Sequence, residues 1–231
     1  MAAPPETITV PAPPADTDSD AYLYWLRDLL APARVERFGG VLLVSGAPTP
    51  EHQDAWGRLY AWLLDWADGG PWGDGPGAPG GAPRGEVLPA VELRLEGAGV
   101  PRPQRGRAPD NGVPDLVLRR RENSRARRVP SGPGRRAPAG YVEGAPDLVV
   151  EVLSPGTERQ DLTTKRQAFA AAGVPGYWIL DWRDRTALVL TRPEGGDYQD
   201  ETPVGWGELV WPPAGEPGSS RWGDHPRFPR G

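Results

Sequence analysis

The segment 147–153 constrains the fold of this chain more than any other part of its sequence. Its order, Asp-Leu-Val-Val-Glu-Val-Leu, is rich in Val and Leu and is typical of a central buried strand. Side chains alternate between the two faces of a strand, so Asp147 and Glu151 belong to one face. A buried carboxylate must be paired or must bind a cation, because an isolated buried charge is costly. The segment therefore predicts a central strand with two acidic side chains that need partners.

A second acidic residue opens the preceding predicted strand in the same way. Pro114-Asp115 repeats the order of Pro146-Asp147, and proline suits the first residue of a strand, where its missing N–H costs nothing. If both strands enter one sheet, Asp115 can lie near Asp147 or Glu151, and neighbouring carboxylates stay ionised only with a cation between them. The alternative is that Asp147 lies in water at the end of its strand and Glu151 pairs with an arginine.

Lys165 is the only lysine among the 26 basic residues of the chain. It follows Asp161 by four positions in a predicted helix, so the two side chains share one helical face. A compact ammonium can hold a water molecule or neutralise developing charge, and its pKa can be lowered, whereas that of a guanidinium cannot. The alternative is a surface lysine with an ion pair to Asp161. Because three carboxylates are predicted to lie near Lys165, we favour a functional role for this lysine.

Further helices and strands are predicted around these segments. Helical spacing, caps and a capping box predict three helices, at 20–30, from Thr49 to about 67, and at 157–172. Gly39-Gly40 is typical of a hairpin turn between strands at 34–38 and 41–45. Other strands are expected at 87–95, 113–118, 177–182, 186–191 and, at an edge, 207–211. We expect an α/β fold with a mixed central sheet flanked by helices, preceded by a helix and a hairpin.

Stretches rich in proline and glycine set the expected organisation of the chain. Residues 1–17 are expected to be a disordered lead-in, 18–212 a single α/β domain, and 213–231 a C-terminal tail. Within the domain, 69–85 and 119–141 are expected to be flexible loops. No apolar run is long enough to cross a bilayer and the N-terminus lacks a secretory signal, so we expect a cytoplasmic protein without a membrane partner.

Composition limits the kinds of metal site that the chain can build. There is no cysteine and there are only two histidines, which excludes thiolate and histidine-rich metal sites. Carboxylates remain, and they favour magnesium, manganese or calcium over zinc. His52 has no second histidine near it and is expected at the surface or near a helix cap.

Arginines are concentrated between residues 102 and 136. The net charge of the whole chain is -5, which argues weakly against a protein that coats nucleic acid. This segment, however, contains 11 arginines and only three acidic residues, so it is a candidate to bind along the phosphates of a nucleic acid. The alternative is a solvated loop in an arginine-rich protein. The candidate nucleic-acid-binding residues are Arg119, Arg120, Arg121, Arg127 and Arg128.

Two stretches of the sequence carry a resemblance to a known family. The first is Pro146-Asp-Leu-Val-Val-Glu-Val-Leu-Ser-Pro-Gly-Thr-Glu-Arg-Gln-Asp-Leu-Thr-Thr-Lys165, and the second is Ala172-Gly-Val-Pro-Gly-Tyr-Trp-Ile-Leu-Asp181. Together they resemble the Uma-type putative restriction endonucleases. That family is a branch of the PD-(D/E)XK nuclease superfamily. The likeness is specific over 141–193 and weaker at 113–118 and 34–48. It implies a restriction-endonuclease-like fold.

The resemblance also implies roles for individual residues. Asp115 and Glu151 would be metal ligands, Asp147 a further carboxylate of the metal site, and Lys165 the active-site lysine. The superfamily usually places this lysine two residues after the glutamate, where this chain has Leu153, so the lysine is displaced onto the following helix. Glu36 matches a glutamate that many members carry near the first helix.

By resemblance, the activity would be Mg²⁺-dependent hydrolysis of phosphodiester bonds in nucleic acid. Mn²⁺ is a further candidate metal, DNA is expected over RNA, and a homodimer is expected because many double-strand cutters act as dimers. One alternative is a catalytically silent, nuclease-like nucleic-acid-binding or regulatory module. Another is a purely structural domain whose Pro-Asp pairs are strand caps, which predicts that the four proposed catalytic side chains lie far apart.

Overall fold

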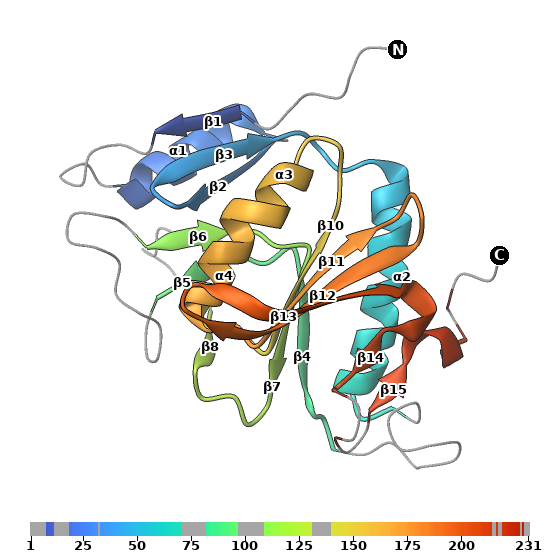
Figure 1. Ribbon diagram of the computed structural model, residues 1–231. Helices are drawn as coiled ribbons and strands as arrows, with labels where there is room; N and C mark the ends of the chain where they lie inside the picture. Colours follow the sequence, from blue (N-terminus) through green and yellow to red (C-terminus); the bar gives the residue numbers. More distant parts are fainter. Residues whose placement is uncertain are drawn as a thin grey trace.

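The computed structural model describes residues 8–11, 19–31, 33–70, 82–96, 109–130, 140–213, 216, 219–226 and 228. Within these residues the chain forms two large mixed sheets with helices packed against them (Figure 1). The expected α/β fold with flanking helices is confirmed, but the strands divide between two sheets and do not form one. None of the helices in the described ranges combines the length and apolar character that a bilayer span requires.

The six-stranded sheet contains the central strand β10, which pairs antiparallel with β7 and parallel with β11. In spatial order its strands are β13 (Asp197–Gly205), β12 (Thr186–Glu194), β11 (Gly176–Asp181), β10 (Leu148–Val152), β7 (Leu116–Arg120) and β4 (Gly85–Pro89). Every residue of β10 is buried, as its run of Val and Leu predicts.

The seven-stranded sheet contains the predicted N-terminal hairpin toward one of its edges. In spatial order its strands are β1 (Ile8–Pro11), β3 (Val41–Ser45), β2 (Arg34–Phe38), β6 (Asp110–Gly112), β5 (Leu93–Leu95), β9 (Tyr141–Gly144) and β8 (Ala126–Val129). Gly39 and Gly40 form the predicted turn between β2 and β3, and both have positive φ, which glycine adopts without strain.

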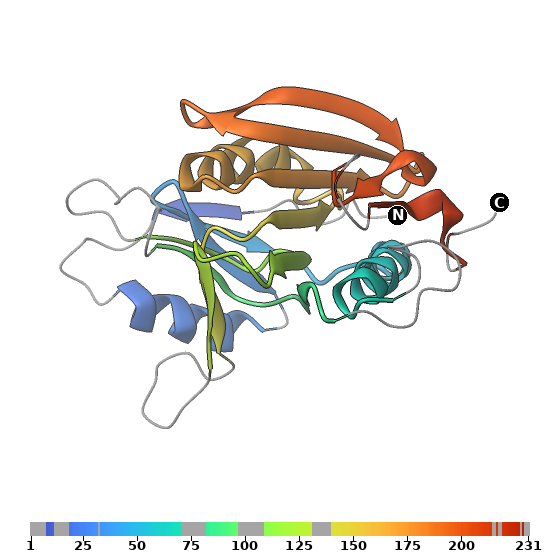
Figure 2. The ribbon, with the colours of Figure 1, turned by 90° about the horizontal axis from the view of Figure 1, so that it is seen from below.

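The helices lie on both sides of the sheets (Figure 2). They are α1 (Ser19–Leu30), α2 (Pro50–Ala67), α3 (Glu158–Gln160), the π-helical turn η2 (Asp161–Lys165) and α4 (Arg166–Ala172). Thr49 caps α2 by accepting a hydrogen bond from the backbone N–H of His52, and Gly173 ends α4 in the left-handed conformation, as the sequence predicts.

Among the described residues, three clusters of buried hydrophobic side chains hold the layers together. The first joins the two sheets and α4, with Phe38 and Val149 among its members. The second joins α2 and the C-terminal segment to the other face of the six-stranded sheet, and contains several tryptophans, Trp62 and Trp178 among them. A small third core lies between α1 and the hairpin.

Two of the points at which the chain passes between the two large sheets are adjacent. The predicted strand 87–95 is in fact two strands, because the chain turns at Ala90, which has positive φ, and continues in the other sheet as β5. The second crossing runs from β6 through Val113 and Pro114 to β7. The two crossings are joined by a hydrogen bond of 3.0 Å from the backbone N–H of Ala90 to the carbonyl oxygen of Asp115. Asp115 therefore lies where the sheets meet.

Three segments expected to lack regular structure contain strands. β1, in the predicted lead-in, pairs with β3, and β8, in the predicted loop 119–141, pairs with β9. In the predicted tail, β15 (Ser220–Arg221) pairs with β14 (Val210–Trp211). The short helical turns η3 (Trp206–Glu208) and η4 (Trp222–Asp224) extend this region, and Trp222 is fully buried. These segments are ordered by strand pairing with distant parts of the chain and by the buried side chain of Trp222, although their composition is rich in proline, glycine or arginine.

Candidate active site

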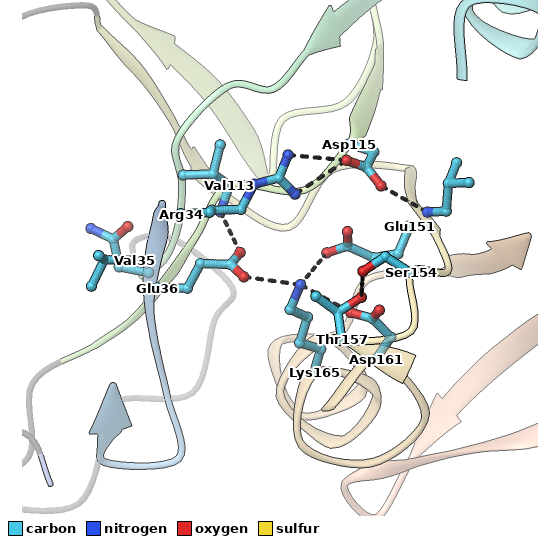
Figure 3. A network of polar contacts seen from close by, with 12 residues as sticks. Arg34, Val35, Glu36, Val113, Asp115, Glu151, Ser154, Thr157, Asp161 and Lys165 are labelled. Carbon is cyan, nitrogen blue, oxygen red and sulfur yellow. Dashed lines mark hydrogen bonds and ion pairs between the residues drawn. The ribbon is translucent and has the colours of Figure 1, made fainter. Parts of the chain in front are cut away.

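Four acidic side chains, which we call the acidic cluster, converge with the single lysine where the sheets meet (Figure 3). Glu36 comes from β2, Asp115 from the residue before β7, Glu151 from β10 and Asp161 from η2. All four are at most 3% exposed, and Lys165 is 2% exposed. Three of the four side chains that the sequence predicts to converge, Asp115, Glu151 and Lys165, therefore lie close together. This does not fit a purely structural domain in which all four lie far apart.

Lys165 is enclosed by three carboxylates. Its Nζ lies 3.0 Å from Oε2 of Glu36, 3.0 Å from Oε1 of Glu151 and 3.0 Å from Oδ1 of Asp161. Burial alone would lower the pKa of Lys165, but these three negative charges raise it well above its usual range. Lys165 is consequently an ammonium group, a donor of hydrogen bonds and not a base.

The π-helical turn explains how one helix supplies two of these groups. Asp161 and Lys165 are the first and last residues of η2, and both side chains are buried. A π-helical turn widens the helix locally and is frequent at functional sites. The predicted shared face of these two residues is confirmed, and their ion pair is buried within the site.

Glu36 ties the lysine to the crossing between the sheets. Its Oε1 accepts a hydrogen bond of 2.7 Å from the backbone N–H of Val113, while its Oε2 contacts Lys165. A carboxylate that accepts a backbone N–H is fixed in place, because the backbone donor cannot rotate away. Glu36 thus holds Lys165 from the side of the hairpin.

Asp115 accepts hydrogen bonds at both of its oxygens. Oδ1 accepts from both terminal nitrogens of Arg34, at 3.1 Å each. Oδ2 accepts from the backbone N–H of Val152 at 2.8 Å and lies 3.0 Å from Nε2 of His52. Burial raises the pKa of Asp115, but the hydrogen bond from His52 and the charge of Arg34 outweigh this effect and hold the pKa well below its usual range. Asp115 is therefore ionised.

Asp115, the residue before β7, lies next to Glu151 of the neighbouring strand β10. Leu116 pairs with Val150 in the antiparallel register of β7 and β10, so continuing this register places Asp115 opposite Glu151. Burial raises the pKa of Glu151 well above its usual range; Lys165 opposes this shift, and the nearby carboxylates of Asp161, Asp115 and Glu36 add to it. The pKa of Asp161 is raised by burial as well. Both shifts favour the protonated form of the carboxyl group, chiefly because the groups are buried.

The residues present fit a divalent cation in charge and in donor type. If all four carboxyl groups of the acidic cluster are ionised, they carry two more charges than the two cations that contact them, Arg34 and Lys165, and a divalent cation would balance this difference. Carboxylate oxygens are ligands that Mg²⁺ and Mn²⁺ prefer. A small cavity of about 20 Å³, lined by Asp115, Glu151 and Lys165 among others, is large enough for one water-sized group.

The side chains are not already arranged as a metal cage. Among the described residues, no three His, Asp or Glu side chains stand around a common point in a way suited to a metal ion. Oδ1 of Asp115 is bonded to Arg34, and Oε1 of Glu151 to Lys165. A metal bound to Oδ1 of Asp115 and Oε1 of Glu151 would therefore compete with these two cations.

Asp147 does not join the site, which corrects the sequence-based expectation. It precedes β10, whereas Glu151 lies near the other end of that strand, so about 13 Å separates them at a rise of about 3.3 Å per residue. Its Oδ2 accepts hydrogen bonds from the backbone N–H of Arg120 at 2.7 Å and from the Asn123 side chain at 2.8 Å. These contacts indicate a role in holding the turn after β7.

The arginines predicted to bind nucleic acid lie away from the acidic cluster. Arg119 and Arg120 end β7, whereas Asp115 precedes its first residue, and Arg127 and Arg128 belong to β8. Four of the five are paired with acidic side chains: Arg119 and Arg128 with Glu86, Arg120 with Glu216, and Arg127 with Glu143. Arg121 is exposed. Residues 102–108 and 131–136 of the arginine-rich segment lie outside the described residues.

Two side chains of the site were not singled out from the sequence. The sequence predicts Arg34 only as part of the hairpin, and it predicts His52 at the surface or near a helix cap. His52 does lie next to the Thr49 cap, but its ring is 4% exposed and contacts Asp115. The position of His52, third in a capped helix that packs on a sheet, could have indicated that its side chain is buried. It could not have indicated which residue the side chain contacts.

Comparisons with known proteins identify the family of the chain and a solved structure with a similar fold. A family model described as "Uma2: Putative restriction endonuclease" matches residues 20–220. Among solved structures, the chain is similar to a crystal structure of a putative nuclease belonging to DUF820 from Anabaena variabilis ATCC 29413. The TM-score is 0.50 and the identity 15%, and the match covers 77% of this chain and 80% of that chain, which shows a shared fold. No curated protein matches the chain.

Proposed function

The chain belongs to the Uma2 family of putative restriction endonucleases, and from this premise we propose that it hydrolyses phosphodiester bonds of DNA with a divalent metal, Mg²⁺ or Mn²⁺. The observation that supports the proposal best is the buried convergence of Glu36, Asp115, Glu151 and Lys165 from four separate elements. Burying so many charged groups is costly, so a purely structural role is a poor explanation.

Asp115 and Glu151 are the residues that would hold the metal, because they are adjacent, buried and on neighbouring strands. When bound, a divalent metal supplies Lewis-acid polarisation of the phosphodiester and lowers the pKa of a coordinated water. His52 and the backbone N–H of Val152 fix Oδ2 of Asp115, and this residue lines the cavity together with Glu151 and Lys165. A fixed orientation of this kind lowers the reorganisation needed at the moment of reaction.

Lys165 supplies a fixed positive charge at the site. Its ammonium is oriented by three carboxylates and donates to Oε1 of Glu151, which places it beside the residues proposed to hold the metal. In this position it neutralises charge that develops on the phosphate oxygens in the transition state. Because its pKa is raised, it performs this role as a cation over the whole neutral pH range.

A second candidate function is a catalytically silent nucleic-acid-binding or regulatory module. It is favoured by the guanidinium of Arg34, which holds the oxygen of Asp115 that a metal would need. In this case the ion pairs of the site would be permanent. The protein would then bind DNA equally well with and without Mg²⁺, and would not cut it.

Plasmid nicking with Mg²⁺, Mn²⁺ or EDTA separates the two functions. We expect metal-dependent nicking by the wild type and its loss in Glu151→Gln, Lys165→Ala and Lys165→Arg, each checked for folding by circular dichroism. Glu194→Gln is the matched control, since Glu194 is exposed and lies on the β12–β13 hairpin. Wild type that binds DNA without nicking it in any of the three conditions would reject the nuclease and support the silent module.

A further inference from the structure

The two oxygens of Asp115 are held by groups of different mobility. Oδ2 is held by the backbone N–H of Val152, which belongs to β10, and by the ring of His52, which is buried on α2. Neither donor can leave without disturbing the sheet or the helix. Oδ1 is held only by the guanidinium of Arg34 among the contacts that the described residues make. Oδ1 is therefore the exchangeable oxygen of the site.

Arg34 is the most exposed member of the group. It is the first residue of β2, and its side chain is 24% exposed, against 3% for that of Asp115. It also lines the small cavity beside Glu151, together with Ser45 and Ser154. A long side chain at the mouth of a site can change rotamer while the backbone stays in place.

A metal and the guanidinium cannot both occupy the space beside Oδ1. Arg34 faces the negative charges of Asp115, Glu36 and Glu151, the same charges that would attract a divalent cation. Two cations a few ångströms apart repel strongly in a buried site, because the effective dielectric constant there is low. Binding of one therefore weakens binding of the other.

We propose that Arg34 is an exchangeable cation: it holds Oδ1 of Asp115 in the metal-free protein, and a divalent metal binds by displacing it. The displaced guanidinium is then free at the mouth of the site to bind a non-bridging oxygen of the substrate phosphodiester. Guanidinium groups bind phosphates and carboxylates through the same two-donor fork, so the exchange keeps the hydrogen bonds of Arg34 satisfied. This inference rests on the proposed nuclease function and adds to it a residue that controls metal entry and binds the substrate.

Mn²⁺ titration tests the exchange independently of catalysis. We would measure the Kd for Mn²⁺ by calorimetry and by the electron paramagnetic resonance signal of free Mn²⁺, without DNA. Arg34→Gln should bind Mn²⁺ about tenfold more tightly than wild type, the scale of a 1.4 kcal/mol change in binding free energy. Arg34→Lys keeps the charge but loses the fork, and should tighten binding by a smaller factor, about threefold. Arg192→Gln, which removes an exposed arginine paired with Asp200, should leave the Kd unchanged.

Nicking rates at saturating Mn²⁺ complete the test. Arg34→Gln should nick plasmid about tenfold or more slowly than wild type, although it binds the metal more tightly. If wild type binds Mn²⁺ and nicks DNA while both Arg34 variants bind Mn²⁺ no more tightly, the exchange is overturned and the nuclease function stands. If neither wild type nor Arg34→Gln binds Mn²⁺, both proposals are overturned. Arg34→Lys keeps the test decisive if Arg34→Gln does not fold.

Discussion

Replacing Lys165 with methionine removes the cation at the centre of the acidic cluster while keeping a side chain of similar length. In the wild type the ammonium is 3.0 Å from an oxygen of each of Glu36, Glu151 and Asp161, and all four side chains are 3% exposed or less. Removing one partner of a buried ion pair costs about 3–5 kcal/mol, because the other charge remains buried and unpaired. We therefore expect Lys165→Met to lower the free energy of unfolding by about 3–5 kcal/mol at pH 8 in EDTA.

The loss should depend on pH in a defined direction. The folded-state pKa of Glu151 and of Asp161 lies above its unfolded value, so the folded state binds more protons than the unfolded state. The stability that these protonated groups contribute is present near the ordinary carboxyl pKa, about 4, and is lost as the pH rises through the raised values. Without Lys165 the two pKa values rise further. The variant should therefore lose less stability relative to wild type at pH 5 than at pH 8.

Urea unfolding, followed by tryptophan fluorescence and far-ultraviolet circular dichroism at both pH values, measures the effect. Arg166→Met is the matched control on the same helix, because Arg166 pairs with the half-exposed Asp197 and Glu201 and should contribute about 1 kcal/mol or less. A loss below about 1 kcal/mol at pH 8, or an equal loss at both pH values, would refute the assignment of Lys165 as the cation that balances the site.

Three further substitutions test the placement of individual residues. Asp147→Asn should lower the free energy of unfolding by about 1–2 kcal/mol, because it weakens the hydrogen bonds from Arg120 and Asn123. The rate of metal-dependent nicking should stay unchanged. A loss of nicking as large as that of Glu151→Gln would show that Asp147 belongs to the site. His52→Leu should cost about 1–3 kcal/mol, because it removes a donor from buried Asp115, and His52→Gln should recover part of that in urea unfolding; equal losses would argue against the hydrogen bond. Gly144→Ala should lower the free energy of unfolding by about 2–3 kcal/mol in the same assay. Gly144 has a φ of +102°, and an added Cβ would lie 1.9 Å from the carbonyl oxygen of Arg125. Wild-type stability of this variant would contradict the local geometry.

The sequence predicts the parts of the site that depend on local periodicity. The alternation of residues in β10 identified Glu151 as an inward-facing carboxylate, and helical spacing identified Asp161 and Lys165 as neighbours. The same alternation misplaced Asp147, because two residues on one face of a strand can still lie at opposite ends of it. Periodicity gives the face of a side chain and not its distance from another element.

The contacts that complete the site are long-range and could not be predicted in this way. Arg34 and His52 are separated from Asp115 by 81 and 63 residues, and nothing local marks either of them as its partner. The division into two sheets was missed for a similar reason. The apolar segment 87–95 is continuous in sequence, and only the positive φ of Ala90 and the pairing of β4 and β5 with different neighbours separate it into two strands.

The central claim is that Asp115 and Glu151 hold a divalent metal, and anomalous diffraction from crystals soaked in Mn²⁺ tests it most directly. We predict an anomalous peak within coordination distance of Oδ1 of Asp115 and of a Glu151 oxygen, about 2.2 Å, with the guanidinium of Arg34 withdrawn from Asp115. Crystals that show Mn²⁺ bound only elsewhere, or not at all, with Arg34 still on Asp115 and Lys165 still on Glu151, would contradict the claim.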